Sequence, residues 1–259
     1  MRRHAHLKPT IRALSICFAC AIGSFALATS AVAGKTRVAV ASNFMAAAKA
    51  IGVLFEKQTE HSVIFSFGAT GQLYTQITQG APYDVFLAAD RARPTLAIER
   101  GYAVRGSRFT YAEGRLALFT RDTSREIDSS TLSSAIESRV AIANPVIAPY
   151  GAAAVAAMQA LGVYEALQPR LVRGTNIAQA YQFAYTGNAA FGFVALSQIA
   201  GRTGGSHWVV PAELHPAIAQ DAVLLVHGAE NAAARAFLAF LKGDGGRRVT
   251  EMFGYGAGP

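Results

Sequence analysis

The sequence predicts an α/β fold made of two units that lie side by side. Short apolar stretches with the character of buried strands alternate with amphipathic helical stretches, which is the pattern of a mainly parallel sheet flanked by helices. This pattern runs from residue 37 to residue 89 and begins again near residue 115. The composition, 52% hydrophobic and 15% charged, is that of a globular chain that can bury a sizeable core.

The first unit is predicted from hydrophobic spacing. Its strands are expected at 37–41, 61–67 and 84–89, and its helices at 43–58 and 71–79. Phe44, Ile51 and Phe55 recur on one face of the first helix. Gly80 follows the second helix, where a glycine commonly ends a helix. The order strand–helix–strand–helix–strand predicts neighbouring parallel strands.

The rest of the chain repeats this alternation. Its strands are expected at 115–120, 140–143, 191–195 and 221–227, and its helices at 151–161, 176–185, 231–241 and 247–253. Two such units with ligand chemistry between them form a natural architecture for a binding site.

The N-terminus has the order of a secretory signal peptide. Four basic residues, at positions 2, 3, 8 and 12, precede an apolar run at 13–28, and Ala31-Val32-Ala33 forms a small-residue cleavage site. The apolar run is short for a membrane anchor and ends in small residues. We therefore expect residues 1–33 to be removed after Ala33 and the mature protein to lie in the periplasm.

The mature chain carries few signs of other functions. Residues 34–259 contain no cysteine, and 20 Lys and Arg against 16 acidic residues give a net charge of +4. The basic residues form no clustered stripe, so we expect no nucleic-acid partner. The histidines lack metal-ligand spacing, and no nucleophile elbow or phosphate-binding loop is present. The sequence thus predicts no metal cation and no enzyme.

Four predicted strand-to-helix junctions share an unusual chemistry. They are residues 41–44, 68–71, 149–152 and 174–177, and none contains Lys, Arg, Asp or Glu. A helix N-terminus offers unpaired N–H groups and a partial positive charge, and several aimed at one point bind an anion. Donors without a carboxylate suit a fully deprotonated tetrahedral anion. The alternative is that Ser, Thr and Asn at these positions only cap helices.

Four stretches also share their order and spacing with one family. They are VAVASNF at 38–44, FGATGQL at 67–73, GAPYDVFLAAD at 80–90 and GFVALSQ at 192–198. Over essentially the whole mature chain, the sequence resembles the periplasmic molybdate-binding proteins. The resemblance implies a two-lobed periplasmic binding protein of the type II-like class with a two-strand hinge. It also implies an ABC importer permease as partner.

The resemblance implies five oxyanion contacts. The residues at the matching positions are Ser42, Asn43, Thr70, Tyr150 and Ile177. Thr70 stands where the family has a serine, and Tyr150 and Ile177 stand where it donates through backbone N–H groups. Some members bind with a tyrosine at the position of Ala195, which leaves a replacement for that contact open. The ligand expected is molybdate or tungstate, with no cofactor.

The expected lobes follow from the same resemblance. Lobe 1 is 34–114 plus 228–259, and lobe 2 is 115–227, with hinge strands near 115–120 and 221–227. We expect a monomer. Two alternatives stay open at this point, namely a binding protein for sulfate or another small oxyanion, and a secreted enzyme, which would need a nucleophile and base pair.

Overall fold

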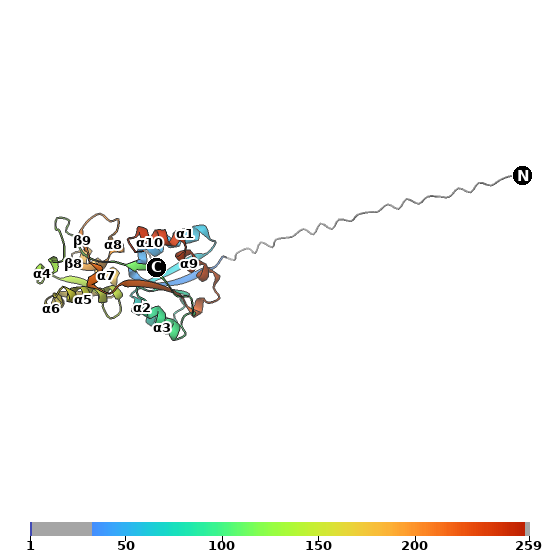
Figure 1. Ribbon diagram of the computed structural model, residues 1–259, viewed down its shortest axis with the longest axis horizontal. Helices are drawn as coiled ribbons and strands as arrows, with labels where there is room; N and C mark the ends of the chain where they lie inside the picture. Colours follow the sequence, from blue (N-terminus) through green and yellow to red (C-terminus); the bar gives the residue numbers. More distant parts are fainter. Residues whose placement is uncertain (2–32, 257–259) are drawn as a thin grey trace. The chain divides into compact units, whose positions relative to one another are not determined.

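The computed structural model describes Met1 and residues 33–256. The predicted signal peptide, apart from Met1 and Ala33, lies outside the described residues. The body that follows contains two five-stranded sheets, each with its own helices (Figure 1). No helix in the described part of the chain is long and apolar enough to span a membrane.

The first sheet is mixed, with the strand order β2-β1-β3-β10-β4. β1 pairs in parallel with β2 and β3, whereas β10 pairs antiparallel with β3 and β4. The strands are β1 (Lys35–Ala41), β2 (Ser62–Gly68), β3 (Val85–Leu87), β4 (Phe109–Gly114) and β10 (Ile218–Leu224).

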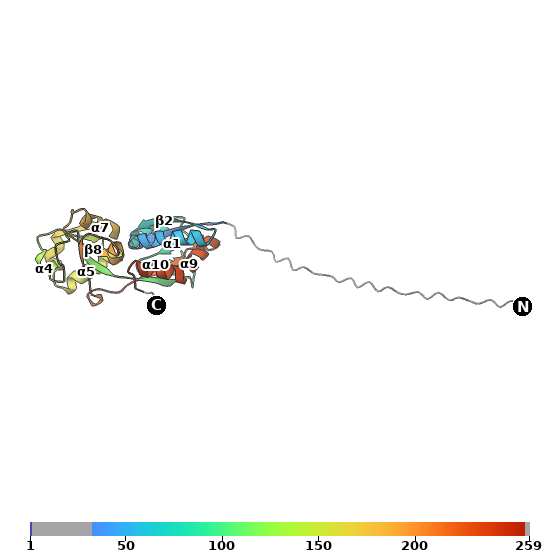
Figure 2. The same ribbon diagram turned by 90° about the horizontal axis from the view of Figure 1, so that it is seen from above.

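Helices cover both faces of the first sheet, because each helix places an apolar stripe on it. α1, α9 and α10 lie on one face and α2 and α3 on the other (Figures 1 and 2). Phe44, Phe55 and Phe237 are fully buried under the first group. The elements are η1 (Ser42–Phe44), α1 (Met45–Gln58), α2 (Thr70–Thr78), α3 (Ala92–Glu99), η4 (Val226–Gly228), α9 (Ala232–Lys242) and α10 (Asp244–Met252).

The second sheet repeats the order of the first. Its strands run β7-β6-β8-β5-β9, with β6 parallel to β7 and β8, and β5 antiparallel to β8 and β9. They are β5 (Leu116–Thr120), β6 (Val140–Ala143), β7 (Leu171–Gly174), β8 (Phe191–Ala195) and β9 (Ser206–Val209). In each sheet three neighbouring strands run parallel. The first of the three along the chain, β1 or β6, lies between the other two, and the second, β2 or β7, lies at the edge of the sheet.

Three helices of the second lobe, α5, α7 and α8, begin where its parallel strands end. α5 is alanine-rich, and its small buried side chains let it approach the sheet closely. The elements are α4 (Thr131–Ser134), α5 (Pro149–Ala160), α6 (Tyr164–Leu167), η2 (Gln168–Arg170), α7 (Ile177–Tyr185), α8 (Leu196–Ile199) and η3 (Ala212–Leu214).

The predicted two-lobed α/β fold is confirmed, and the structure adds an antiparallel pair to each sheet. The chain passes from the first sheet to the second between β4 and β5, and returns between η3 and β10. The segments predicted as hinge strands lie beside these crossings, but β5 pairs within the second sheet and β10 within the first. The lobe boundaries remain predictions.

Candidate functional site

A small cavity lies where four helices begin. It is about large enough to hold one water molecule. It is lined by Ala41, Ser42, Asn43, Gly68, Ala69, Thr70, Ala89, Ala148, Pro149, Tyr150 and Ile177. All five residues that the sequence predicts as oxyanion contacts are therefore brought together at one cavity.

The cavity is built from equivalent places in the two lobes. η1 and α2 follow β1 and β2, and α5 and α7 follow β6 and β7. β1 and β2 are the first two parallel strands of the first sheet along the chain, and β6 and β7 are the first two of the second sheet, which has the same strand order. The carboxyl ends of parallel strands meet at one edge of a sheet, so each lobe presents two helix starts. The four predicted junctions are thus the four walls of the cavity.

Thr70 is the first residue of α2 and is 1% exposed. The residue before the helix is Ala69, so Thr70 does not cap it. The Thr70 hydroxyl instead accepts a hydrogen bond of 3.1 Å from the Ala89 N–H. A hydroxyl that accepts in this way keeps its own proton for donation. The alternative that Thr70 is only a capping residue is therefore wrong.

α5 leaves one backbone donor at the cavity. Its first residue is Pro149, which has no N–H, and the N–H groups of Gly151 and Ala152 both donate to the Ala148 carbonyl. The Tyr150 N–H lies between them in the first turn of α5, where the helix itself offers no acceptor. Gly151 permits this arrangement, because a Cβ there would lie 2.2 Å from the Ala143 carbonyl oxygen.

α7 leaves its first N–H in the same way. The side chain of Asn176 caps the helix by accepting from the N–H groups of Ala178 and Gln179, at 3.0 and 3.1 Å. The N–H of Ile177, which is 3% exposed, is not among the groups that Asn176 caps, and as the first N–H of α7 it has no acceptor within the helix. This junction therefore has both a capping side chain, that of Asn176, and a backbone donor that the cap does not use, the N–H of Ile177.

Ser42 and Asn43 form the start of η1 and are 5% and 3% exposed. The Ser42 hydroxyl makes no hydrogen bond to any described residue and borders the cavity. The Asn43 side chain is already occupied, because its amide donates to the Gln220 Oε1 at 2.8 Å and to the Tyr255 hydroxyl at 3.1 Å. Asn43 is therefore left with its backbone N–H for a ligand.

A buried polar network lies behind Asn43 and was not predicted. Gln220 on β10 accepts from the Tyr111 hydroxyl at 3.1 Å and donates to the Tyr150 hydroxyl at 3.3 Å. The Tyr150 hydroxyl therefore lies in this network. The part of Tyr150 that faces the cavity is its backbone. Burial is the largest cause that raises the pKa of Tyr111, Tyr150 and Tyr255 above their usual value. These hydroxyls are neutral near neutral pH.

Ala195, the position at which the sequence left a further contact open, does not line the cavity. It is fully buried at the end of β8. The Gln198 side chain accepts from the Ala195 N–H at 2.9 Å and donates to the Ile177 carbonyl at 3.2 Å. Gln198 thus fixes the start of α7 from the neighbouring helix. The motif at 192–198 includes Gln198, although the spacing of the motif alone does not assign this role.

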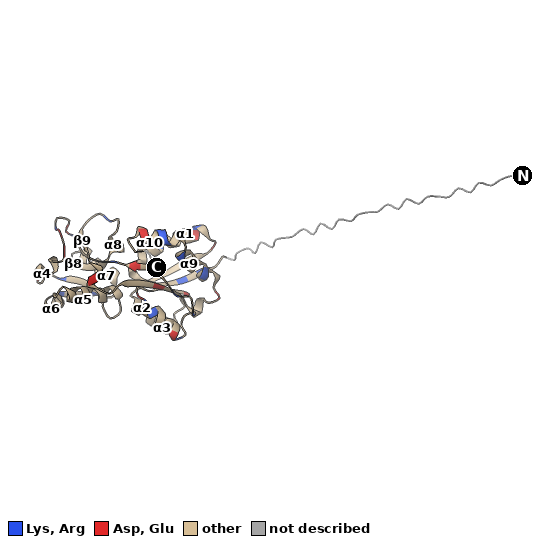
Figure 3. Ribbon diagram, viewed as in Figure 1, with Lys and Arg blue, Asp and Glu red and all other residues tan. Residues whose placement is uncertain are grey.

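No charged side chain is among the residues that line the cavity. Charged residues are scattered over both lobes (Figure 3). No group of three or more metal-ligating side chains occurs among the described residues. The cavity therefore offers neutral donors at helix starts, a combination that accepts a compact anion and presents no carboxylate acceptor to a protonated one.

A two-lobed α/β fold with a small donor-lined cavity at helix starts defines a solute-binding protein. The chain belongs to the family described as bacterial extracellular solute-binding protein, whose model matches residues 36–256. This is a family of solute-binding proteins and not of enzymes.

Individual relatives agree with this membership. The chain is 53% identical over 246 residues to the molybdate-binding protein ModA of Rhodobacter capsulatus, which covers 95% of this chain and 96% of the relative. It is 48% identical to that of Azotobacter vinelandii, over 91% and 95% of the two chains. A solved structure, the Azotobacter vinelandii periplasmic molybdate-binding protein, matches with a TM-score of 0.83 and 36% identity, over 86% of this chain and 100% of the other.

Proposed function

We propose that this protein captures molybdate or tungstate in the periplasm and delivers it to the membrane permease of an ABC importer. In this proposal the protein acts as a monomer after removal of residues 1–33 and needs no cofactor. The relatives named above are molybdate-binding proteins, and their similarity extends over nearly the full chain.

One observation carries the proposal. The backbone N–H groups of Thr70, Tyr150 and Ile177 stand in the first turns of their helices, where the helix itself offers no acceptor, and the three residues are buried at the cavity. A buried N–H without a partner costs free energy comparable to a lost hydrogen bond, so such groups are rare. Three around one cavity are best explained by a ligand that accepts from all of them.

The remaining donors fit the same ligand. The hydroxyls of Ser42 and Thr70 each keep a proton, and the Asn43 N–H completes the first wall. A tetrahedral dianion has four oxygens that only accept, so it matches a site of this kind. The charge makes each hydrogen bond stronger than a neutral one.

Titration calorimetry of the mature protein tests the proposal. Molybdate and tungstate should bind with similar affinity, because both are tetrahedral dianions of nearly one size. Sulfate is smaller, so donors held by two lobes cannot all reach its oxygens at about 2.8 Å, and it should bind much more weakly. Equal binding of sulfate, or no binding of either metal oxyanion, would refute the assignment.

The export step has a separate test. The mature N-terminus should be Gly34, because Ala31-Val32-Ala33 provides the cleavage site. Mass spectrometry of the protein recovered from a periplasmic extract measures this directly. A chain that still begins at Met1 in that extract would contradict the predicted processing.

A further inference from the structure

The two lobes are joined at the cavity by hydrogen bonds that need no ligand. The N–H of Gly71, on α2 of the first lobe, donates to the carbonyl of Ile147 in the second lobe at 2.8 Å. The Ser197 hydroxyl, on α8 after the second sheet, donates to the carbonyl of Asn43 at 3.0 Å. Both bonds start or end next to a residue of the cavity.

The first of these bonds uses a group that otherwise belongs to the anion site. Gly71 follows Thr70 at the start of α2, where the N–H groups have no partner within the helix. The Thr70 N–H faces the cavity, whereas the Gly71 N–H is taken by the other lobe. One helix end therefore contacts both the ligand position and the opposite lobe.

The space at Gly71 is set by the opposite lobe. A Cβ at this position would lie 3.1 Å from both the Cα and the carbonyl oxygen of Ile147, and 3.0 Å from the Arg93 guanidinium. The guanidinium is the end of a flexible side chain, but Ile147 contributes backbone. Apart from the Arg93 guanidinium, no atom of the first lobe is among the three atoms nearest to this Cβ. A side chain at residue 71 would thus be in tight contact with the second lobe only when the two lobes are closed.

The Ser197 bond acts on the other side of the cavity. The Asn43 carbonyl accepts from Ser197 and also from the Tyr255 hydroxyl at 2.8 Å. Tyr255 lies in the first lobe, packed against its core, so one carbonyl is held from both lobes. Removing the Ser197 hydroxyl leaves the carbonyl paired with Tyr255. Such a change weakens the contact between the lobes without leaving an unpaired group.

We infer that Gly71 and Ser197 are positioning residues that hold the lobes closed over the anion, with Gly71 favoured because a Cβ there would be in tight contact with the backbone of Ile147. This inference rests on the proposed function for the identity of the ligand, but not for the closed geometry. It predicts variants that fold normally and lose affinity through faster release.

The test uses Gly71→Ala, Gly71→Leu and Ser197→Ala in the mature protein. Gly71→Leu should weaken molybdate binding by about 5- to 150-fold, since overpacking a tight contact costs about 1–3 kcal/mol. Gly71→Ala should have a smaller effect of the same sign. Ser197→Ala should weaken binding about 3- to 10-fold, which corresponds to one neutral hydrogen bond.

Three further measurements separate positioning from general damage. The rate of molybdate release in stopped flow should rise while the association rate stays near that of the wild type. The melting temperature without ligand should not fall for Gly71→Ala, because alanine favours a helix over glycine. Small-angle X-ray scattering should show a larger radius of gyration for Gly71→Leu, either without ligand or at saturating molybdate.

Matched controls exist in the same chain. Gly245 is the second residue of α10, as Gly71 is of α2, and a Cβ there meets only the Phe240 ring at 3.3 Å. Ser134 donates to the Thr131 carbonyl within its own lobe. Gly245→Ala and Ser134→Ala should leave affinity and scattering unchanged.

The outcomes are distinguishable from those of the proposed function. If the wild type bound no oxyanion but Gly71→Leu were more open in scattering, the proposed ligand would be wrong and this inference would stand. If the wild type bound molybdate and all three variants bound and scattered as it does, the inference would be overturned.

Discussion

Thr70 combines two hydrogen-bonding roles in one hydroxyl. The oxygen accepts from the Ala89 N–H, which fixes the hydroxyl at the cavity and leaves its proton free. Ala89 follows β3 and also lines the cavity. The side chain therefore ties two loops of the first lobe together and turns a donor toward the proposed ligand position.

Replacing Thr70 by alanine should weaken molybdate binding roughly 10- to 100-fold, since a hydrogen bond to a charged acceptor contributes about 1.5–3 kcal/mol. It should also lower the melting temperature modestly, because the Ala89 N–H loses its acceptor. Calorimetry and a thermal melt without ligand measure the two effects. Thr70→Ser should restore both, and Thr78→Ala, on the exposed side of the same helix, should change neither.

The positions of the site residues could be predicted from sequence, but the directions of two side chains could not. Small and hydroxyl-bearing residues before a helical pattern are visible as a run of letters. Whether Asn43 and Tyr150 turn toward the cavity depends on Gln220, which is 177 residues from the first and 70 from the second. Gln220, which with Asp221 interrupts an otherwise apolar strand, is the one available signal, and it does not name its partners.

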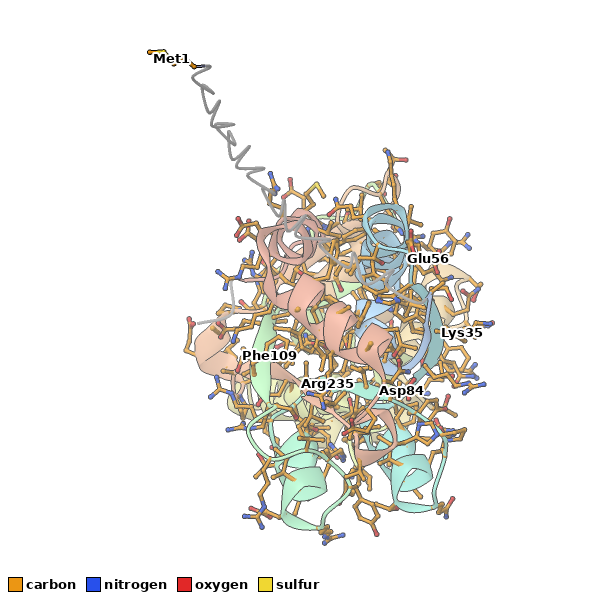
Figure 4. All side chains as sticks on the ribbon, turned by 90° about the vertical axis from the view of Figure 1, so that its right-hand side faces the viewer. Met1, Lys35, Glu56, Asp84, Phe109 and Arg235 are labelled. Carbon is orange, nitrogen blue, oxygen red and sulfur yellow. The ribbon has the colours of Figure 1, made fainter. Side chains whose placement is uncertain are left out.

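At the scale of elements, Asp84 holds the start of β3 to its neighbours. Its buried carboxylate accepts from the Arg37 N–H at 2.7 Å and the Asn231 amide at 3.2 Å. The Thr36 hydroxyl and the His227 ring also contact it, at 3.3 and 2.9 Å. Figure 4 shows Asp84 from the side of the first lobe that faces away from the second. One carboxylate thus joins β1, β3, η4 and the start of α9.

Asp84→Ala should lower the free energy of unfolding by at least about 3 kcal/mol, because several donors lose a charged acceptor at once. Urea unfolding measures this loss. The affinity for molybdate should stay the same in the folded variant, since Asp84 lies at the amino end of β3, opposite the cavity. Asp122→Ala provides the control, because Asp122 accepts only from Ser124 in an exposed turn. An equal loss in both variants would contradict this role.

The parallel strands other than β7 were predictable because each is a short apolar run followed by a helix. β4, β7 and β9 were not predicted. β7 (Leu171–Gly174) and β9 (Ser206–Val209) are four-residue strands at the edges of the second sheet, where only one neighbour pairs with them. Their side chains are partly exposed, so the hydrophobic pattern is weak. Edge strands of this kind form because they pair with the sheet, and their own sequence pattern does not predict them.

At the scale of the whole molecule, three buried tyrosines connect the lobes. Tyr111 and Tyr255 belong to the first lobe and Tyr150 to the second, and the Asn43–Gln220 pair links their hydroxyls. Burial raises the pKa of all three above the usual value of about 10. The folded protein therefore keeps their protons at a pH where the unfolded chain releases them.

The sign of the pH dependence follows from this difference. Below about pH 10 both states hold the three protons, so the tyrosines make stability independent of pH there. Above it the unfolded state binds fewer protons than the folded state, and the free energy of unfolding falls as pH rises. Each tyrosine should contribute a slope of up to about 1.4 kcal/mol per pH unit.

Urea unfolding between pH 8 and pH 11.5 should therefore show a plateau followed by a steep loss of stability. Other groups also titrate at high pH, so the informative quantity is a difference between variants. Tyr150→Phe should reduce the slope above pH 10 by about 1.4 kcal/mol per pH unit, since one proton no longer differs between the states. Tyr185→Phe, which removes a hydroxyl from a half-exposed ring, serves as the control. Identical slopes for the wild type and Tyr150→Phe would show that the Tyr150 hydroxyl reaches solvent when folded, and that the lobes do not enclose the network as the closed structure has it.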